Sequence, residues 1–323
     1  MEGAGTSRPG ADAMNRDSPR TVVARTCTVG DEHRDFSIPQ ADMRKQYGID
    51  DDLATELLDL GLPHRRDDGG LLFDWRDLSN VAAGLNLDSE DRVLMRRWTR
   101  SLGAALQQQR GVYNIRFDWR CPSPGHAGDC EFTLDPLTAP IMPHNPAKPL
   151  ADGSLVGAAE PLYHEYDFGP AFNNVVAAAR RITFHRLPLA LVDDLGYLAE
   201  TGLADCRLAN VHLRKLAADA GLRVRPAAGL FVGVPFPARH AWFEVSVGDR
   251  WVAADPFFLH TLTSWGIMSG EEWPLNHSPR NVLIRLSNLP EIGGPLVLHN
   301  GHRAPLRILA RWKMASAGAE LPG

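Results

Sequence analysis

The sequence contains no apolar run of the ~18–20 residues that a membrane-spanning helix needs. Its opening, Met-Glu-Gly-Ala-Gly-Thr-Ser-Arg-Pro-Gly, lacks the apolar segment of a secretory signal. We therefore expect a cytoplasmic protein without a membrane partner. Thiols stay reduced in that compartment, so the 4 cysteines of the chain need not form disulfides.

The signatures of several enzyme classes are also missing. There is no Walker-type phosphate loop, no Gly-x-Gly-x-x-Gly after a strand pattern and no His-Glu-x-x-His. A formal net charge of −5 argues against a general nucleic-acid partner. What is present is enough apolar material for a sizeable core, since 44% of the 323 residues are hydrophobic.

Composition along the chain predicts four segments. Residues 1–38 are rich in Gly, Ser, Arg and Asp without periodicity, which indicates a disordered tail. Residues 39–110 show helical patterns around a short hairpin at 65–73 and form a helical N-terminal domain. Residues 111–160 are a Pro-rich irregular connection, and residues 161–323 carry the chemistry described next.

The order helix, hairpin, helix in the N-terminal domain faintly resembles a winged helix of the excisionase type. Charge opposes a DNA-binding role, because residues 41–91 hold 13 acidic and 5 basic side chains. We interpret this domain as a packing or substrate-gating unit.

Cys206 is predicted to begin a helix. Asp205 before it is a good N-cap residue, Leu208 and Val211 follow at helical spacing, and Gly221 is a suitable C-terminal stop. At a helix start, unpaired backbone N–H groups and the positive end of the dipole stabilise a thiolate. The alternative is a buried cysteine that packs as a small apolar side chain.

A hairpin is predicted over residues 240–255. The segment alternates, is rich in aromatic and β-branched residues, and contains Gly248-Asp249 as a two-residue turn of type II′. In the register that this turn sets, Asp255 faces Trp242, which shares one side of the ribbon with His240. Asp255 and His240 are then diagonal neighbours, roughly 7–8 Å apart at Cα, a distance that side chains can bridge.

These three side chains have complementary roles in nucleophilic catalysis. Cys206 would attack an acyl carbon, His240 would take the thiol proton, and Asp255 would fix the imidazole tautomer and stabilise the imidazolium. Taken singly, His240 could be an ordinary strand residue and Asp255 the turn residue before Pro256.

Beyond Asp255 we expect a loop that runs through Trp273. Strands are predicted at 282–286, 296–299 and 307–312, where they would close an antiparallel sheet behind the hairpin.

Cys206 at a helix start, His240-Ala-Trp-Phe-Glu-Val and Trp251-Val-Ala-Ala-Asp255-Pro256 together resemble the transglutaminase-like superfamily of papain-type folds. The resemblance covers about residues 160–290. It implies an α+β, papain-like core in which the nucleophile helix packs on an antiparallel sheet, preceded here by the helical extension. It also implies a Cys206–His240–Asp255 triad, an acyl-enzyme intermediate, no metal and no organic cofactor.

One departure from the family concerns the residue before the nucleophile. Asp205 stands where aromatic or small residues are common, so no oxyanion side-chain donor is identified. The Cys206 backbone N–H is the donor that we propose for a developing oxyanion, because helix-start N–H groups suit negative charge.

The expected activity is that of a cysteine acyltransferase that moves an acyl group to an amine. The donor would be small or carrier-bound, such as a carrier-protein or CoA thioester, as in amide-forming family members of antibiotic biosynthesis. A peptidase or amidase of the same superfamily is an alternative. So is an arylamine N-acetyltransferase, although its Arg-Gly-Gly-x-Cys signature is missing before Cys206. A non-catalytic binding domain would be expected to have lost a triad member.

A second group of reactive residues lies in the Pro-rich segment, where Cys121, His126 and Cys130 occur within one loop. Structural zinc sites usually have four ligands, and no fourth ligand is evident beside these three. Free thiols, a labile disulfide and a zinc site all stay open, and we expect less than stoichiometric zinc in the purified protein.

Overall fold

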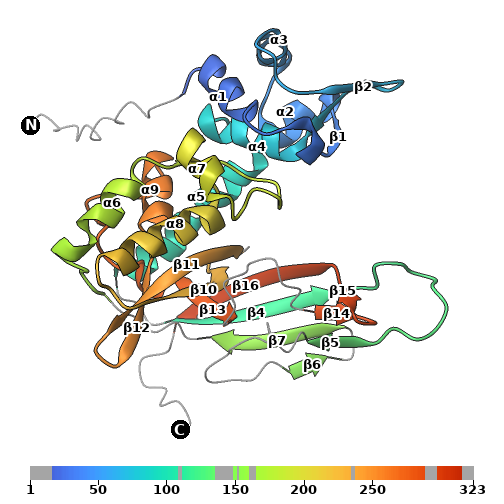
Figure 1. Cartoon of the computed structure of the whole chain (residues 1–323). Coiled ribbons are helices and arrows are strands. Elements are labelled where there is room, and N and C mark those ends of the chain that lie inside the picture. Colours follow the sequence, from blue (N-terminus) through green and yellow to red (C-terminus); the bar gives the residue numbers. More distant parts are fainter. Residues whose placement is uncertain are drawn as a thin grey trace, which may run out of the picture.

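The computed structural model describes residues 17–107, 111–134, 148–150, 153–159, 165–233, 237–287 and 297–314. Figure 1 shows a small helical unit at the N-terminal end, a group of helices below it, and two β-layers beneath these helices. The prediction of a fold that combines helices with antiparallel sheet is confirmed.

The N-terminal unit combines four helices with a three-stranded antiparallel sheet of order β1-β3-β2. Its elements are α1 (Pro19–Thr26), β1 (Phe36–Pro39), α2 (Met43–Tyr47), α3 (Asp51–Asp59), β2 (Arg65–Asp67), β3 (Gly70–Asp74) and α4 (Trp75–Gly84). Leu57, Phe73 and Leu78 are 0% exposed and form the centre of its own core. The predicted order of helix, hairpin and helix is confirmed.

The predicted disordered tail is wrong for residues 17–38. Ser18 accepts a hydrogen bond from the Thr21 N–H and Pro19 occupies the first turn, so α1 begins with a standard N-cap. Val22 and Val23 of α1 are buried in the N-terminal core. Residues 1–16 lie outside the described part of the chain.

Helix α5 (Glu90–Leu106) joins the N-terminal unit to the remainder of the protein. Its Trp98 packs edge-on against Phe231, with ring centroids 4.8 Å apart. A Cβ atom on Gly233 would lie 2.2 Å from Trp98 Nε1, so this contact requires glycine. The N-terminal extension is thus fitted closely against the strand that leads into the candidate site.

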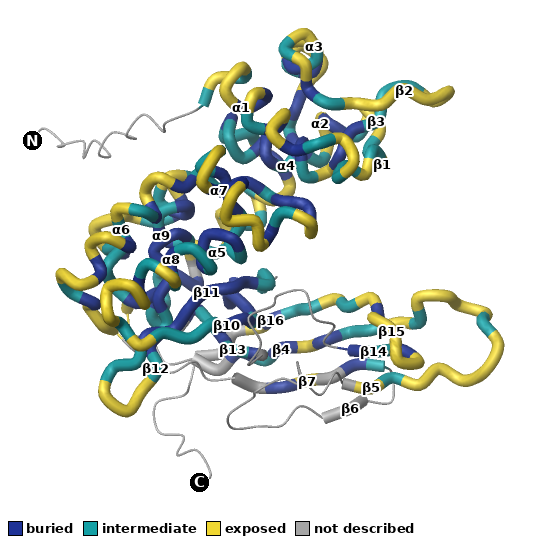
Figure 2. The backbone as a smooth tube through the Cα atoms, in the orientation of Figure 1, coloured by how far each residue is buried: buried dark blue, intermediate teal, exposed yellow. Residues whose placement is uncertain are grey.

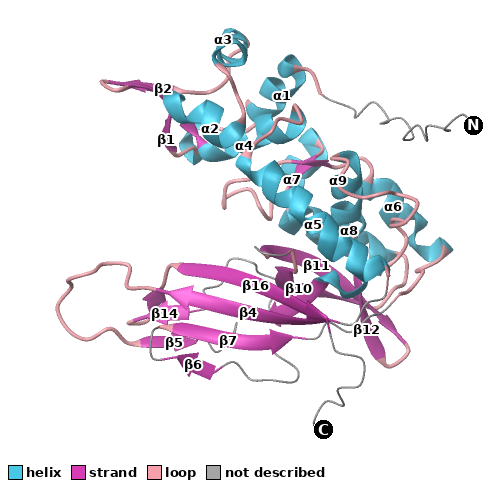
Figure 3. Cartoon of the chain, turned by 180° about the vertical axis from the view of Figure 1, so that it is seen from behind, coloured by secondary structure: helices cyan, strands magenta, loops and turns pink. Residues whose placement is uncertain are grey.

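A four-stranded antiparallel sheet of order β12-β11-β10-β13 forms the middle layer. Its strands are β10 (Val224–Phe231), β11 (Ala238–Val247), β12 (Arg250–Ala254) and β13 (Leu283–Ser287). The helices that cover it are α6 (Asn173–Ala179), α7 (Leu195–Thr201), α8 (Cys206–Asp219) and α9 (Pro256–Ser264). Views from both sides show these helices on the same face of the sheet (Figures 1 and 3). The short strands β8 (Thr183–Phe184) and β9 (Leu203–Ala204) pair in parallel, and β9 comes immediately before α8.

Two further sheets form the other β-layer. One has the order β16-β4-β7-β6 and consists of β4 (Gly111–Trp119), β6 (Lys148–Leu150), β7 (Ser154–Ala159) and β16 (Leu306–Met314). The other has the order β15-β14-β5 and consists of β5 (Phe132–Leu134), β14 (Val297–His299) and β15 (His302–Arg303).

These strands correct two sequence predictions. Residues 111–160 are not merely an irregular connection, because they supply β4 to β7. The last strands do not close the sheet behind the hairpin either: β13 joins it through β10, whereas β16 pairs with β4 and β14 pairs with β5.

Both faces of the middle sheet are covered. Phe243 and Val245 face the helices and share a core with Leu208 of α8. Leu230 and Ile284 face the other β-layer. Burial is therefore continuous from His240 to Val245 in β11, and much of this strand is dark blue in Figure 2. Among the described helices, none has the length and apolarity required to cross a membrane.

Candidate active site

The hairpin has the register that the sequence predicts. Strands β11 and β12 pair antiparallel, from Phe243 opposite Ala254 to Val247 opposite Arg250. Gly248 has a φ of 60°, which the first central position of such a turn requires. Asp255 follows Ala254 and leaves the strand at the end of the paired region.

The segment after Asp255 differs from the prediction. It is not a loop but helix α9, whose N-cap is Asp255 itself. The Asp255 Oδ1 atom accepts a hydrogen bond from the Phe258 N–H at 3.1 Å. Pro256 occupies the first helical position, where its missing N–H costs nothing. The cap fixes the carboxylate between the end of β12 and the start of α9.

His240 and Asp255 form a buried pair. His240 Nε2 lies 2.5 Å from Asp255 Oδ2, and the two residues are 5% and 0% exposed. The imidazole lies near two aromatic rings, with its centroid 4.4 Å from that of Phe258 and 6.2 Å from that of Trp242. These rings restrict the tilt of the imidazole and exclude water from one side of the pair.

Cys206 contacts the same imidazole from α8. The Asp205 carboxylate accepts a hydrogen bond from the Leu208 N–H at 2.9 Å, so Cys206 is the first residue of the helix, as predicted. Cys206 is among the groups whose charge and hydrogen bonding raise the pKa of His240, so its side chain lies close to the imidazole. Because Asp255 occupies Nε2, Nδ1 is the ring nitrogen that remains to exchange a proton with Cys206. Cys206 is partly exposed and accessible to a reactant.

The charges around His240 favour its protonated form. Burial alone would lower its pKa, but the charge and hydrogen bond of Asp255, together with those of Cys206, raise it to about 10. Both ring nitrogens therefore carry a proton at neutral pH, and the imidazole is positively charged. A protonated imidazole beside a sulfur stabilises a thiolate, which is the nucleophilic form.

The carboxylate that departs from the family pattern has a structural function here. Burial raises the pKa of Asp205 to about 6, against the opposing effect of hydrogen bonds from the Leu208 and Arg207 backbone. Its side chain caps α8 and leaves the Cys206 backbone N–H, one of the first N–H groups of the helix, without an intrahelical acceptor. This N–H remains our proposed oxyanion donor.

Asn210 is a site residue that the sequence analysis missed. Its Nδ2 group lies 2.8 Å from the Cys206 carbonyl, 2.9 Å from the Ala241 carbonyl and 3.3 Å from Asp255 Oδ1. It is 3% exposed. One amide thus connects the nucleophile helix, the histidine strand and the carboxylate. The available signal was a polar residue four positions after Cys206, on the same face of the helix.

Replacing Asn210 with alanine is expected to lower stability by about 1–3 kcal/mol, because buried carbonyl and carboxylate oxygens lose their donor. Loss of the donor to Asp255 is also expected to slow alkylation of Cys206 by iodoacetamide. Asn80→Ala is a matched control, since Asn80 is 6% exposed and bonds the backbone of Arg186 in a different region. Denaturant unfolding and peptide mass spectrometry measure both effects, and equal slowing in the two variants would contradict a role at the site.

The raised pKa of His240 predicts a pH dependence of stability. A folded pKa of about 10, above the ordinary 6.5, means that protonation stabilises the folded state. This contribution is fully present below about pH 6.5 and is lost as the pH rises to about 10. We expect the melting temperature of the wild type, relative to that of Asp255→Asn, to fall across this range. A constant difference between the two proteins would contradict the charged pair.

Comparisons with known proteins find a structural likeness and no match by sequence. No family model and no curated protein matches the sequence. A solved structure described as "a Putative Cysteine Protease from Cytophaga hutchinsonii" is similar at 9% identity and a TM-score of 0.28. The likeness covers 66% of this chain and 93% of that chain.

Proposed function

We propose that the protein is a cysteine acyltransferase with a transglutaminase-like, papain-type core, and that Cys206, His240 and Asp255 are its catalytic residues. The observation that carries this proposal is a buried imidazole bound through Nε2 to a carboxylate, with Cys206 at the start of the helix that Asn210 ties to the histidine strand. A nucleophile at the start of a helix that packs on an antiparallel sheet supports the papain-type assignment.

The first half-reaction acylates the enzyme. The Cys206 thiolate attacks the carbonyl carbon of the donor, and the Cys206 N–H stabilises the negative charge that develops on oxygen. The bond from carbon to the leaving group breaks as His240 transfers its Nδ1 proton to that group. The products are a thioester on Cys206 and a neutral imidazole, whose Nε2–H remains bonded to Asp255.

The second half-reaction releases the acyl group to an amine. The amine nitrogen attacks the thioester carbonyl while His240 Nδ1 accepts a proton from it. The carbon–sulfur bond then breaks and Cys206 leaves as a thiolate beside the imidazolium, which restores the starting state. Water in place of the amine would give the free acid by the same steps, as in a peptidase or amidase.

The donor that we propose is a small or carrier-bound acyl group, such as a carrier-protein or CoA thioester, in an amide-forming step of specialised metabolism. The resemblance to the transglutaminase-like superfamily supports this choice. A thioester donor is chemically suited to Cys206, because the first half-reaction then exchanges one thioester for another.

The test is an incubation of the full chain with an acyl thioester of N-acetylcysteamine, with and without a primary amine, followed by mass spectrometry of products and protein. We expect an acyl adduct on the protein and an amide product that requires the amine. Cys206→Ala provides the background rate. Free acid as the sole product at high amine concentration would identify a hydrolase, and an unconsumed thioester would favour a binding domain.

A further inference from the structure

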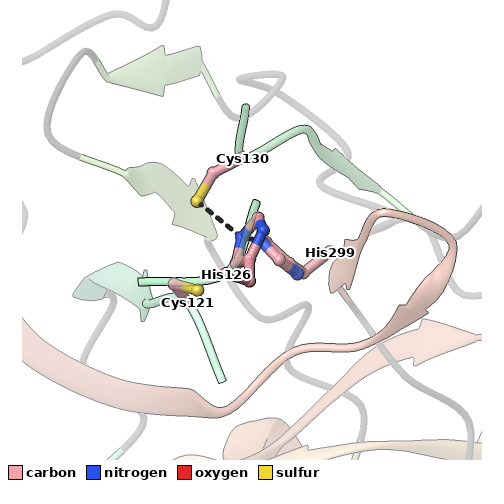
Figure 4. Close-up of side chains that lie close together, drawn as sticks. All are labelled: Cys121, His126, Cys130 and His299. Carbon is pink, nitrogen blue, oxygen red and sulfur yellow. Dashed lines mark hydrogen bonds between the residues drawn. The ribbon is translucent and has the colours of Figure 1, made fainter. Parts of the chain in front are cut away.

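A second cluster of reactive side chains lies in the β-layer opposite the helices. Cys121, His126 and Cys130 come from the loop between β4 and β5, and His299 is the last residue of β14. Figure 4 shows the four side chains directed toward one another. The loop extends from the end of this layer that lies away from α8 (Figures 1 and 3). The cluster is therefore separate from the triad.

Two distances within the cluster match those between ligands of one tetrahedral metal ion. The four possible ligand atoms all lie within 4.8 Å of one another. His126 Nε2 lies 3.3 Å from His299 Nε2 and 3.4 Å from Cys130 Sγ. Zinc bonds of about 2.0–2.1 Å to nitrogen and about 2.3 Å to sulfur place two nitrogens about 3.3–3.4 Å apart and nitrogen and sulfur about 3.5 Å apart.

The His126 tautomer is set for metal binding. His126 Nδ1 lies 2.9 Å from the Ala127 carbonyl oxygen, which can only accept a hydrogen bond. Nδ1 must therefore carry the proton, and Nε2 presents its lone pair to the centre of the cluster. A backbone carbonyl that orients a histidine in this way is typical of the surroundings of metal ligands.

Backbone hydrogen bonds hold the chain next to Cys130 against the end of the strand that carries His299. Phe132 of β5 pairs with His299 of β14. The next residues extend this contact, since the Asn300 N–H donates to the Glu131 carbonyl at 2.9 Å and the Glu131 N–H donates to Asn300 Oδ1 at 2.8 Å. Cys130 is thus held next to a strand pairing that also fixes His299, which is 5% exposed.

We propose that Cys121, His126, Cys130 and His299 bind one Zn²⁺ as a structural centre. Two cysteines and two histidines are a common ligand set for tetrahedral zinc, and four protein ligands leave no open position for catalysis. Binding releases the two thiol protons, so two thiolates balance the charge of the ion. A two-iron cluster does not fit, because its ligands are divided between two metal centres, whereas these four atoms all lie within 4.8 Å of one another.

The proposed zinc centre replaces the expectation, based on the sequence alone, of less than one zinc ion per chain. His299 is the ligand that sequence reasoning lacked, and it lies 173 positions from His126. Coordination would tie the loop between β4 and β5 to β14. The proposal is independent of the proposed function, whose triad contains none of these residues.

The first test is the metal content of the full chain, expressed with added zinc and analysed by mass spectrometry of the metal after dialysis. We expect about one zinc per chain in the wild type, and at least ten-fold less in Cys130→Ser and His299→Ala. Cys130 is exposed, so its replacement by serine should leave the fold intact by circular dichroism. Cys27→Ser is the matched control, because Cys27 is also exposed and free and lies outside the cluster.

The second readout is thiol protection. In the zinc-loaded protein, iodoacetamide is expected to alkylate Cys121 and Cys130 at least ten-fold more slowly than after zinc removal by a chelator, with the rate at Cys206 unchanged. Unchanged rates at Cys121 and Cys130 would overturn the proposal. So would a folded wild type that binds no zinc, one that carries iron with sulfide, or one with a Cys121–Cys130 disulfide. None of these outcomes bears on acyl transfer at Cys206.

Discussion

Replacement of Cys206 with alanine is expected to abolish turnover. The acyl group then has no sulfur atom with which to form a thioester. Removal of the nucleophile of a hydrolase triad reduces kcat by a factor of about 10⁶. Folding should change little, because Cys206 lies in the first turn of α8 and is partly exposed. The measurement is kcat/KM with an acyl thioester, together with the melting temperature.

The control for this prediction is Cys27→Ala. Cys27 is the residue that ends α1 and has no place in the site, so this variant should retain wild-type activity. Activity of Cys206→Ala within ten-fold of the wild type would remove Cys206 from the mechanism.

Asp255→Asn is expected to reduce kcat/KM by roughly 10²–10⁴, the range known for a catalytic aspartate in a serine-protease triad. An asparagine amide facing His240 would donate to Nε2 and shift the ring proton to Nδ1. A neutral imidazole with its single proton on Nδ1 cannot take the thiol proton of Cys206, so the pair of thiolate and imidazolium would not form. The substitution therefore tests the tautomer and not the volume of the side chain.

The fold of this variant should survive. The Asn side-chain oxygen can still accept from the Phe258 N–H and cap α9, and a neutral His240 leaves no unpaired buried charge. A melting temperature within about 2–8 °C of the wild type corresponds to a loss of about 1–2 kcal/mol in a domain of this size. A near-normal rate in this folded variant would leave Asp255 with the capping function alone.

The local parts of the site could be predicted from the sequence. Gly248 in a two-residue turn sets the hairpin register, and the register brings Asp255 near His240. Asp205 marks the start of α8 by its capping side chain. Each of these features depends on residues that are close in the chain, where the physical signal is strong.

The sequence does contain signals for helix α1 and for the capping function of Asp255. Asp255-Pro256 and Ser18-Pro19 both place a capping side chain immediately before a proline, which is a helix-start pattern. Reading the first pair as a turn, and the second as part of a tail, missed both helices.

Strand β10 shows why part of the sheet was missed. Pro226 lies within it, and proline in a central strand removes a ladder hydrogen bond. The strand tolerates it because β13 pairs with β10 only between Ala228 and Phe231, while Pro226 faces Phe243 of β11. The residues of one strand do not predict where the strand that pairs with it will end.

The remaining omissions concern contacts between distant parts of the chain. Strand β4 pairs with β16 from Gly111 opposite Met314 onward, and His299 meets His126 across a similar separation. Such pairings depend on how whole layers pack. A single sequence contains no periodic pattern that reveals which distant segments will pair. Asn210 was missed for a related reason, since its three acceptors come from three different elements.

The most direct test of the central claim needs no substrate. Iodoacetamide alkylation at pH 7, followed by peptide mass spectrometry, measures the reactivity of all four cysteines in one experiment, after chelation to free any metal-bound thiol. If His240 activates Cys206, this cysteine should react at least about ten-fold faster than Cys27, an exposed thiol outside the site. His240→Gln should remove that advantage. Equal rates at Cys27, Cys121, Cys130 and Cys206 would contradict the assignment of Cys206 as an activated nucleophile.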